Sequence, residues 1–208
     1  MPSLIFRKRL MNQTGYQILG DFHENIGEYA ISSIKLEDAE PIRLWRNQQI
    51  SALRQSNILS KDEQRSYFEN VIEPSFSDKN PKQILLRYTF NNNLIGYGGL
   101  VHLNWTNLKG EVSFLLDTNR TKDTDQYSIE CKTFLKLIKK CAFEKLGLNK
   151  ISTYAYSHRK NHVETIENAG FTREGILRQD TIVDSNWVDA ILASCLHSEF
   201  VKSENSPK

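Results

Sequence analysis

The stretch ENAGFTREGILR, residues 167–178, joins the end of one predicted helix to the start of a predicted strand. The helix covers residues 161–168 and is closed by Gly170, because glycine accepts the left-handed backbone that commonly ends a helix. A strand over residues 171–177 follows, and a second strand over residues 187–196 is the last predicted element. The C-terminal part of the domain is therefore expected to be a short helix and two strands.

The central part of the chain changes from strands to a long helix and back. The helix begins at about Ser128 and ends at the C-capping Gly147, with apolar residues and cysteines on one face and lysines on the other. A strand over residues 151–156 follows it. Three strands precede it, of which the first two form a hairpin over Asn91-Asn92-Asn93. These three strands are expected at residues 83–90, 94–103 and 111–116.

The N-terminal part of the domain contributes one strand and two helices. Residues 29–36 are typical of a strand, and Asp38 with Pro41 indicates the start of the first helix. The second helix starts at a capping box, in which Ser60 and Glu63 bind amide donors that have no partner inside the helix. The full order is strand, two helices, three strands, helix, strand, helix and two strands. This order predicts an α/β (α+β) domain with a mostly antiparallel sheet and one parallel crossover.

Size and composition fit one globular domain without a strongly charged partner. The 208 residues include 27 basic and 25 acidic side chains, which give a formal net charge of +2. This balance argues against the basic field of a nucleic-acid-binding protein. We expect an N-terminal extension at residues 1–28, the domain at residues 29–200 and a flexible tail at residues 201–208.

The sequence lacks the signals of secretion, membrane insertion and metal binding. Cys131, Cys141 and Cys195 are an odd number of cysteines in apolar runs, which is typical of a reducing compartment. Near the N-terminus the basic residues follow the apolar stretch instead of preceding it, and no uncharged run approaches the ~18 residues that span a bilayer. We therefore expect a cytoplasmic protein without membrane contact. His158 and His162 have the spacing of two ligands on one helix face, but no third ligand has a suitable spacing, so no metal is predicted.

Four strings of residues together resemble the GNAT superfamily of N-acetyltransferases, and the resemblance covers about residues 29–200. The strings are LWRN at 44–47, LIGYGGL at 94–100, AFEKLGLNKI at 142–151 and the stretch at 167–178 quoted above. The resemblance implies the GNAT fold, in which a mostly antiparallel sheet with flanking helices contains a splayed pair of parallel strands. It also implies an acyltransferase that moves an acetyl group from acetyl-CoA to a primary amine.

The string at 44–47 is similar to a GNAT branch that includes acetyltransferases of amino-sugar nucleotides. It implies a small-molecule amine acceptor, such as a nucleotide-linked amino sugar, with Trp45, Arg46 and Asn47 as substrate-binding residues. The string at 167–178 is shared with ribosomal-protein N-terminal acetyltransferases, which keeps a protein N-terminus as an alternative acceptor. A catalytically inactive GNAT-fold binding module is the second alternative, and a homodimer is left open.

In the family, acetyl-CoA enters the opening between the two splayed strands. The pantetheine arm would bind backbone groups near Leu115 and Leu116, as an added strand does. The pyrophosphate would face amide donors at the start of the long helix, where the family has Arg/Gln-x-x-Gly-x-Gly/Ala. Ile129 and Cys131 stand where this pattern has glycine or alanine, and this departure supports the inactive alternative. The residues expected to bind the cofactor are Leu115, Leu116, Gln126, Ser128, Ile129, Glu130, Cys131 and Asn161.

An amine acceptor must lose a proton before it attacks a thioester, and the thiolate that leaves needs an acid. Glu111 opens the strand that lines the cleft, where many GNAT enzymes keep a water-linked carboxylate, so we expect Glu111 to be the general base. The family often takes the acid from a tyrosine in the helix before the Gly-Phe pair, but Ile166 stands at that place. Tyr154 is the expected substitute, with Tyr156 on the same face of its strand as the alternative.

Overall fold

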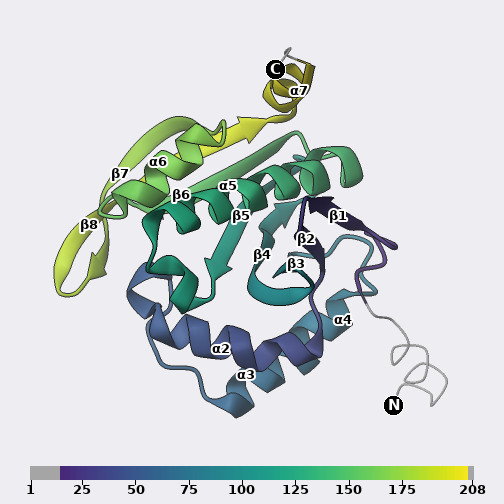
Figure 1. Ribbon diagram of the computed structural model, residues 1–208, viewed down its shortest axis with the longest axis horizontal. Coiled ribbons are helices and arrows are strands. Elements are labelled where there is room, and N and C mark those ends of the chain that lie inside the picture. The colour runs from purple at the N-terminus through teal and green to yellow at the C-terminus, as the bar shows by residue number, and fades with distance from the viewer. Residues whose placement is uncertain (1–14, 206–208) are drawn as a thin grey trace.

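The computed structural model describes residues 15–205, which form one eight-stranded sheet covered by helices (Figure 1). The strands lie in the order β1-β2-β3-β4-β5-β6-β8-β7, and every neighbouring pair is antiparallel except β5 and β6. The predicted mixed sheet with one parallel pair is therefore confirmed. The strands are β1 (His23–Ile26), β2 (Tyr29–Ser33), β3 (Ile84–Phe90), β4 (Asn93–Asn104), β5 (Lys109–Leu116), β6 (Lys150–Tyr156), β7 (Thr172–Val183) and β8 (Asn186–Leu196).

The helices follow the predicted order, with two differences in their bounds. The long helix α5 begins at Thr124 instead of about Ser128, because the Asp123 carboxylate accepts the N–H groups of Asp125 and Gln126 and so caps an earlier turn. The tail expected to be flexible from residue 201 is helical up to Asn205, and residues 206–208 lie outside the described part. The helices are α2 (Ala39–Gln48), α3 (Lys61–Tyr67), α4 (Glu73–Ser75), α5 (Thr124–Lys140), α6 (Lys160–Asn168) and α7 (His197–Asn205).

Two local sequence signals have the structure that their chemistry predicts. Ser60 caps α3: its Oγ accepts the Glu63 N–H, and the Glu63 carboxylate accepts the Ser60 N–H at 2.8 Å. Asn91 and Asn92, between β3 and β4, have φ values of 49° and 63°, a left-handed conformation that asparagine tolerates and that a tight hairpin requires. The segment predicted as an N-terminal extension contributes β1, which pairs with β2 at the edge of the sheet.

Helices cover both faces of the sheet, as two neighbouring residues of β4 show. The Tyr97 hydroxyl accepts a hydrogen bond from Arg46 of α2 at 2.8 Å, so this residue points to the α2 face. A Cβ atom placed on the next residue, Gly98, would point to Phe134 of α5. Because successive residues of a strand point to opposite faces, α2 and α5 lie on opposite sides of the sheet.

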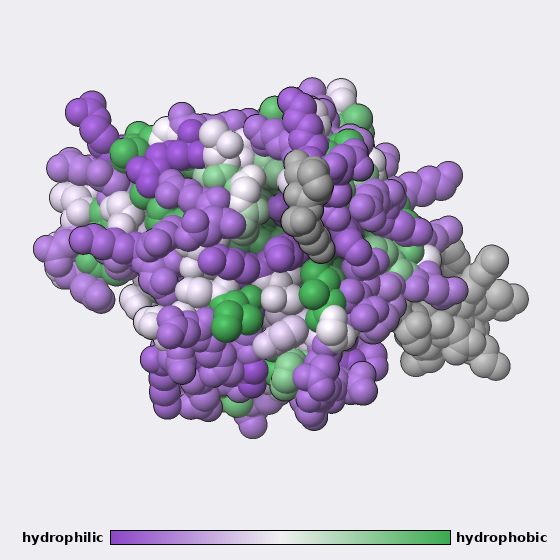
Figure 2. Space-filling model, turned by 45° about the horizontal axis from the view of Figure 1, so that its top comes forward, coloured by the Kyte–Doolittle hydropathy of each residue, from purple (hydrophilic) through white to green (hydrophobic). Residues whose placement is uncertain are grey.

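An aromatic cluster joins α5 to the middle of the sheet. The Phe114 and Phe134 rings stack with their centroids 4.6 Å apart, and the Tyr88 ring meets Phe134 edge-on at 5.4 Å. Tyr88 and Phe134 are fully buried. Hydrophilic residues cover most of the face shown in Figure 2, and the apolar residues visible there form small separate groups. Most large apolar side chains of residues 15–205 are buried between the sheet and the helices.

Gly98 allows α5 to approach the sheet closely, which leads to the first prediction. An added Cβ would press against Ser113 O and lie 2.5 Å from Phe134 Cζ. We expect Gly98→Ala to destabilise the protein by about 2–3 kcal/mol in urea unfolding, as overpacking of a core does. Gly175→Ala is the matched control, because its Cβ meets no atom of residues 15–205 within 4 Å, and it should change stability by less than about 1 kcal/mol. Equal stability of the two variants would contradict the close packing at Gly98.

Candidate active site

The parallel strands β5 and β6 pair only over their first three residues. Lys109 to Glu111 are in register with Lys150 to Ser152, and beyond these the strands separate. Each strand keeps its other neighbour along its whole length, since β5 stays paired with β4 and β6 with β8. The predicted splay of the parallel pair is therefore confirmed, and it leaves one backbone edge of β5 open.

The register shows which backbone groups of β5 point to this open edge. The Asp117 N–H donates to Ile95 O of β4 at 2.8 Å. Alternation then directs the N–H and C=O groups of Leu115 to β4, and those of Phe114 and Leu116 to the open edge. The edge groups are thus those of Phe114 and Leu116, and of the two residues expected near the pantetheine arm Leu116 has its backbone groups at this edge. Gln49 Nε2 donates to Leu116 O at 2.8 Å and occupies that carbonyl.

A cavity of about 180 Å³ lies where the two strands part. Its walls come from both strands, from α5 and α6, and from the segment after α2. Both expected catalytic residues, Glu111 and Tyr154, line it. The other lining residues are Arg46, Ala52, Leu53, Arg54, Val101, Val112, Ser113, Phe114, Cys131, Leu135, Thr153, Tyr156, Arg159, His162 and Ile166.

Arg54 connects the two expected catalytic residues. Its guanidinium forms an ion pair with the Glu111 carboxylate, and its Cζ lies 4.5 Å from the centroid of the Tyr154 ring. The Arg54 side chain is 50% exposed, so the ion pair is partly hydrated and weak. Glu111 and Tyr154 therefore both contact the guanidinium group of Arg54, which a ligand can displace.

The Tyr154 hydroxyl donates a hydrogen bond to Asp180 Oδ2 at 2.5 Å, a partner that the sequence did not indicate. Asp180 belongs to a bulge of β7, in which residues 178–180 lie opposite Asp189 of β8. Desolvation, together with the carboxylate of Asp180, raises the pKa of Tyr154. The hydroxyl therefore keeps its proton at neutral pH, as a general acid must.

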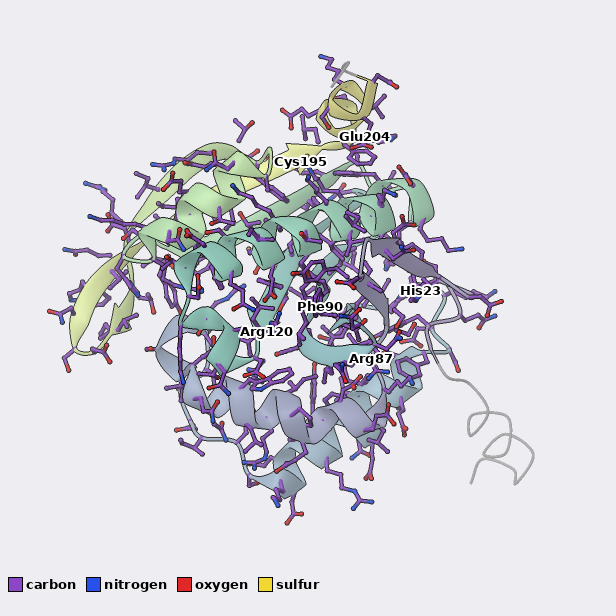
Figure 3. The ribbon with its side chains drawn as sticks, viewed as in Figure 1. His23, Arg87, Phe90, Arg120, Cys195 and Glu204 are labelled. Atoms are coloured by element: carbon purple, nitrogen blue, oxygen red, sulfur yellow. The ribbon has the colours of Figure 1, made fainter. Side chains whose placement is uncertain are left out.

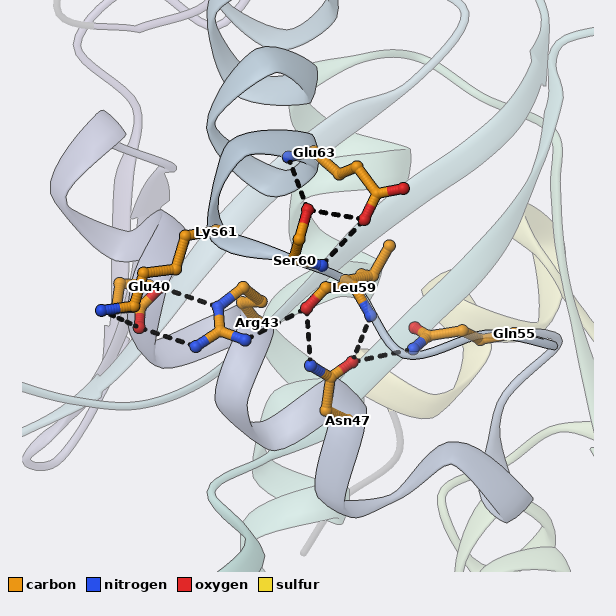
Figure 4. Close-up of polar contacts among 8 residues, drawn as sticks. All are labelled: Glu40, Arg43, Asn47, Gln55, Leu59, Ser60, Lys61 and Glu63. Carbon is orange, nitrogen blue, oxygen red and sulfur yellow. Dashed lines mark hydrogen bonds and ion pairs between the residues drawn. The ribbon is translucent and has the colours of Figure 1, made fainter.

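The three residues expected to bind substrate have different surroundings. Arg46 lines the cavity and donates to Tyr97 Oη and Gln55 Oε1. Trp45 is buried in the core. Asn47 instead fixes the backbone of Leu59, since its Oδ1 accepts the Leu59 N–H and its Nδ2 donates to the Leu59 carbonyl, each at 2.9 Å (Figure 4). Of the three, Arg46 is the one that lines the cavity.

The start of α5 differs from a bare amide loop. Residues 128–131 lie inside the helix, where their N–H groups bond to carbonyls four residues earlier. Glu130 is fully buried and paired with Arg120, whose guanidinium lies 5.6 Å from the Phe90 ring (Figure 3). Cys131 is also fully buried, whereas Ile129 is 58% exposed. These four residues therefore offer no free amide to a pyrophosphate, and the glycine-free loop is explained by an extra helical turn.

Side chains next to the cavity provide other polar groups at this end. Ser128 Oγ lies 3.3 Å from Asn161 Oδ1, so two of the expected cofactor residues meet between α5 and α6. Gln126 is in the first turn of α5. Arg159 lines the cavity and forms no ion pair within residues 15–205. The cavity and the backbone groups of Phe114 at the open edge of β5 are thus candidates to bind a pantetheine arm. Arg159, Ser128 and Asn161 are candidates to bind the polar pyrophosphate end of the cofactor.

His162 belongs to a hydrogen-bonded chain instead of a metal site. Arg159 Nη2 donates to Tyr127 Oη at 3.3 Å, and Tyr127 Oη lies 2.7 Å from His162 Nδ1. Burial raises the pKa of Tyr127, so its hydroxyl stays protonated, and it shares a hydrogen bond with His162 Nδ1 whose direction is set by the imidazole tautomer. His158 stacks on Tyr156 and does not join this chain. Within the described residues, no cluster of three or more His, Cys, Asp or Glu could hold a metal ion.

Comparison with known proteins gives a family match and a shared fold. A family model described as an acetyltransferase (GNAT) domain matches residues 31–192. The search of curated proteins found no match. Among residues 15–205, no helix is long and apolar enough to cross a membrane.

Solved structures with a similar fold include spermidine N-acetyltransferase from Vibrio cholerae. Its complex with CoA and spermine has a TM-score of 0.74 at 17% identity, and the match covers 85% of this chain and 99% of that one. A dodecameric structure of the same enzyme in an intermediate state gives a TM-score of 0.72 at 18% identity, covering 86% and 100%. At this identity the likeness establishes the fold.

The half-buried imidazole of His162, at the wall of the cavity, leads to a prediction about acid stability. Burial lowers the pKa of His162 to about 3, with Arg159 adding to the effect. The folded protein thus holds His162 neutral, whereas the unfolded chain takes up a proton below about pH 6.5, so stability falls as the pH drops from 6.5 towards 3. Between pH 7.5 and 5 this group should cost about 2 kcal/mol of unfolding free energy.

We expect His162→Gln to lose that share of the pH dependence in urea unfolding at the two pH values. His158→Gln is the control, because this exposed histidine has no part in the chain, and it should keep the wild-type dependence. A His162→Gln protein as acid-sensitive as the wild type would contradict a neutral buried imidazole.

Proposed function

This chain belongs to the GNAT family of N-acetyltransferases, and we propose that it transfers the acetyl group of acetyl-CoA to the primary amine of a small molecule, a nucleotide-linked amino sugar being the favoured class. The observation that carries the proposal is the position of Glu111 and Tyr154. Both line one cavity at the point where β5 and β6 part. This is the opening in which the family accommodates the thioester.

The residues of the cavity supply a proton acceptor and a proton donor for direct attack. Glu111 takes the proton that the amine loses as its nitrogen bonds to the acetyl carbon. Asp180 holds the Tyr154 hydroxyl before the reaction, and the hydroxyl turns from Asp180 to the sulfur and gives it the proton as the carbon–sulfur bond breaks. The amine reaches Glu111 by displacing Arg54, whose half-exposed side chain is held weakly. Because the amine attacks the thioester directly, no cysteine nucleophile is needed. Cys131, at the wall of the cavity, is fully buried.

The charges of the cavity favour an acceptor with an anionic part. Among residues 15–205, it is lined by Arg46, Arg54 and Arg159 and by a single acidic residue, Glu111. The positively charged walls would attract a nucleoside diphosphate group, whereas they would repel a polyamine. The structural relatives that act on spermidine make a polyamine the natural competitor to test. A deep acidic groove would favour a protein N-terminus as the acceptor, and the residues that line this cavity do not form one.

An inactive binding module remains the alternative from another class, and the bonded amides of residues 128–131 are the observation in its favour. Thermal shift with acetyl-CoA separates the two. At a hundred times its dissociation constant the ligand should stabilise the fold by about 2.7 kcal/mol, a rise in Tm of roughly 5–10 °C for a chain of this size. No shift with acetyl-CoA, in a protein that melts cooperatively, would overturn the proposed enzyme.

The general base is tested by Glu111→Gln, which keeps the size of the side chain but cannot accept the proton. We expect kcat to fall by ~10²–10⁴ and the affinity for acetyl-CoA, measured by titration calorimetry, to be preserved. Glu73→Gln on α4 is the control, since this glutamate is exposed and lies outside the cavity, and its kcat should stay at the wild-type value. A Glu111→Gln enzyme with wild-type kcat at every pH would remove Glu111 from the mechanism.

A further inference from the structure

A second cavity, of about 340 Å³, lies between α2, α3 and the sheet. It meets the first cavity at Arg46, Val101 and Ser113, which line both. A group held in the second cavity can therefore extend to the place where Glu111 lies. The remaining lining residues are Ile42, Leu59, Glu63, Gln64, Tyr67, Phe68, Gln83, Leu85 and Tyr97.

Gln64 is an unpartnered polar side chain in this cavity. It is only 5% exposed, and its carboxamide forms no hydrogen bond with any of residues 15–205. Within residues 15–205, Arg87 Nε is the one fully enclosed side-chain N or O atom that has no hydrogen-bond partner. The Gln64 amide atoms have no partner either and are not in that class, so they are not fully enclosed. The carboxamide therefore opens into the cavity that it lines. The donor and acceptor atoms of this carboxamide are thus not used by residues 15–205, and they are open to a ligand in the cavity.

The other polar groups of this cavity are neutral or already paired. Gln83 Nε2 donates to Tyr67 Oη at 2.7 Å, and Arg46 Nη1 donates to Tyr97 Oη at 2.8 Å. The one acidic lining residue, Glu63, is used by the capping box, where its carboxylate accepts both the N–H and the hydroxyl of Ser60 (Figure 4). A second ammonium group of an acceptor would thus find no free carboxylate here.

The walls suit a compact body that is apolar on its faces and carries hydroxyl groups at its rim. Phe68, Tyr67 and Tyr97 supply aromatic surface, and Ile42 and Leu85 supply aliphatic surface. A carboxamide offers one acceptor and two donors, which matches adjacent hydroxyl groups. A volume of about 340 Å³ is at the small end of ligand pockets and holds one sugar ring.

We infer that the second cavity holds the uncharged, hydroxylated ring of the acceptor, and that Gln64 is the residue that selects it. The inference rests on the proposed transferase function and names the substrate class of the same site. The ring hydroxyls bond to the Gln64 carboxamide, and the amine on the ring reaches the junction at Ser113. Any anionic group attached to the ring lies towards Arg46.

The experiment compares three acceptors under the same conditions: two UDP-linked amino sugars that differ in the ring carbon carrying the amine, and spermidine. Gln64→Met removes the hydrogen-bonding groups at nearly constant volume. We expect it to raise KM for the better sugar about tenfold, the effect of one lost hydrogen bond, with kcat and the affinity for acetyl-CoA kept. Gln48→Met is the matched control, because Gln48 is exposed at the end of α2 and lines neither cavity.

Gln64→Glu is the second variant, which keeps the shape of the side chain and adds a negative charge. It should raise KM for the sugar and lower KM for spermidine, a change of preference that loss of folding cannot imitate. Faster transfer to spermidine than to both sugars by the wild type, or an unchanged KM in Gln64→Met, would overturn the inference.

Two further outcomes separate the inference from the proposed function. Wild-type protein that is stabilised by acetyl-CoA but acetylates neither sugar overturns the inference and leaves the transferase intact. Wild-type protein that acetyl-CoA does not stabilise overturns the transferase, and the inference falls with it.

Discussion

The arrangement of the active site depends on the separation of β5 from β6 after three paired residues. Two strands that part inside a sheet leave backbone donors and acceptors without partners, and such groups are stable only where something else binds them. One of them, Leu116 O, is bound by the Gln49 side chain at the end of α2. Among residues 15–205, no side chain binds the backbone groups of Phe114, which lines the cavity. At the open edge of β5, the Leu116 carbonyl is thus bound by the protein itself, and the backbone groups of Phe114 are left for a ligand.

Helix α5 connects the two strands and fixes how far they part. Gly98 lets this helix lie against the sheet, and Phe134 fills the space that a side chain there would occupy. The buried ion pair of Glu130 with Arg120, together with the hydrogen bond from Tyr88 Oη to Glu130 O at 3.0 Å, ties the start of the helix to the core. A carboxylate that is fully buried needs such a partner. The second turn of α5, which contains Glu130, is therefore an integral part of the core, and the amides of residues 128–131 are used inside the helix.

Much of the fold could be predicted from the sequence, because its signals are local. The capping box at Ser60 and the asparagine hairpin act within a few residues, and the splay follows from the family resemblance. The site was less predictable, because it depends on long-range geometry. Asp180 reaches Tyr154 through a bulge in β7. Which backbone groups of β5 face the open edge depends on how β5 pairs with β4, and the sequence does not show this pairing.

The residues of α2 and α3 also show that the sequence alone does not reveal which side chains line a cavity. Trp45, Arg46 and Asn47 are adjacent in the sequence, yet one packs in the core, one lines the cavities and one holds a loop. A helix turns each neighbour by about 100°, so a motif on a helix cannot be assigned as a whole to one wall. Gln64 carried no signal at all, since a glutamine in a helix is typical of a solvated face. Its importance comes from burial without a partner, a property that exists only in the folded chain.

The charges at the junction of the two cavities also bear on the chemistry. An amine in water is protonated near neutral pH and is then no nucleophile. Arg46 and Arg54 line the route to Glu111, and a cation that enters between guanidinium groups is disfavoured relative to the neutral amine. The same groups attract an anionic substituent of the acceptor. We expect the positive walls to do two things together: they hold the charged part of the substrate and favour the deprotonated form of its amine. Less is then required of Glu111 as the base, because deprotonation of the amine is already favoured where the amine binds.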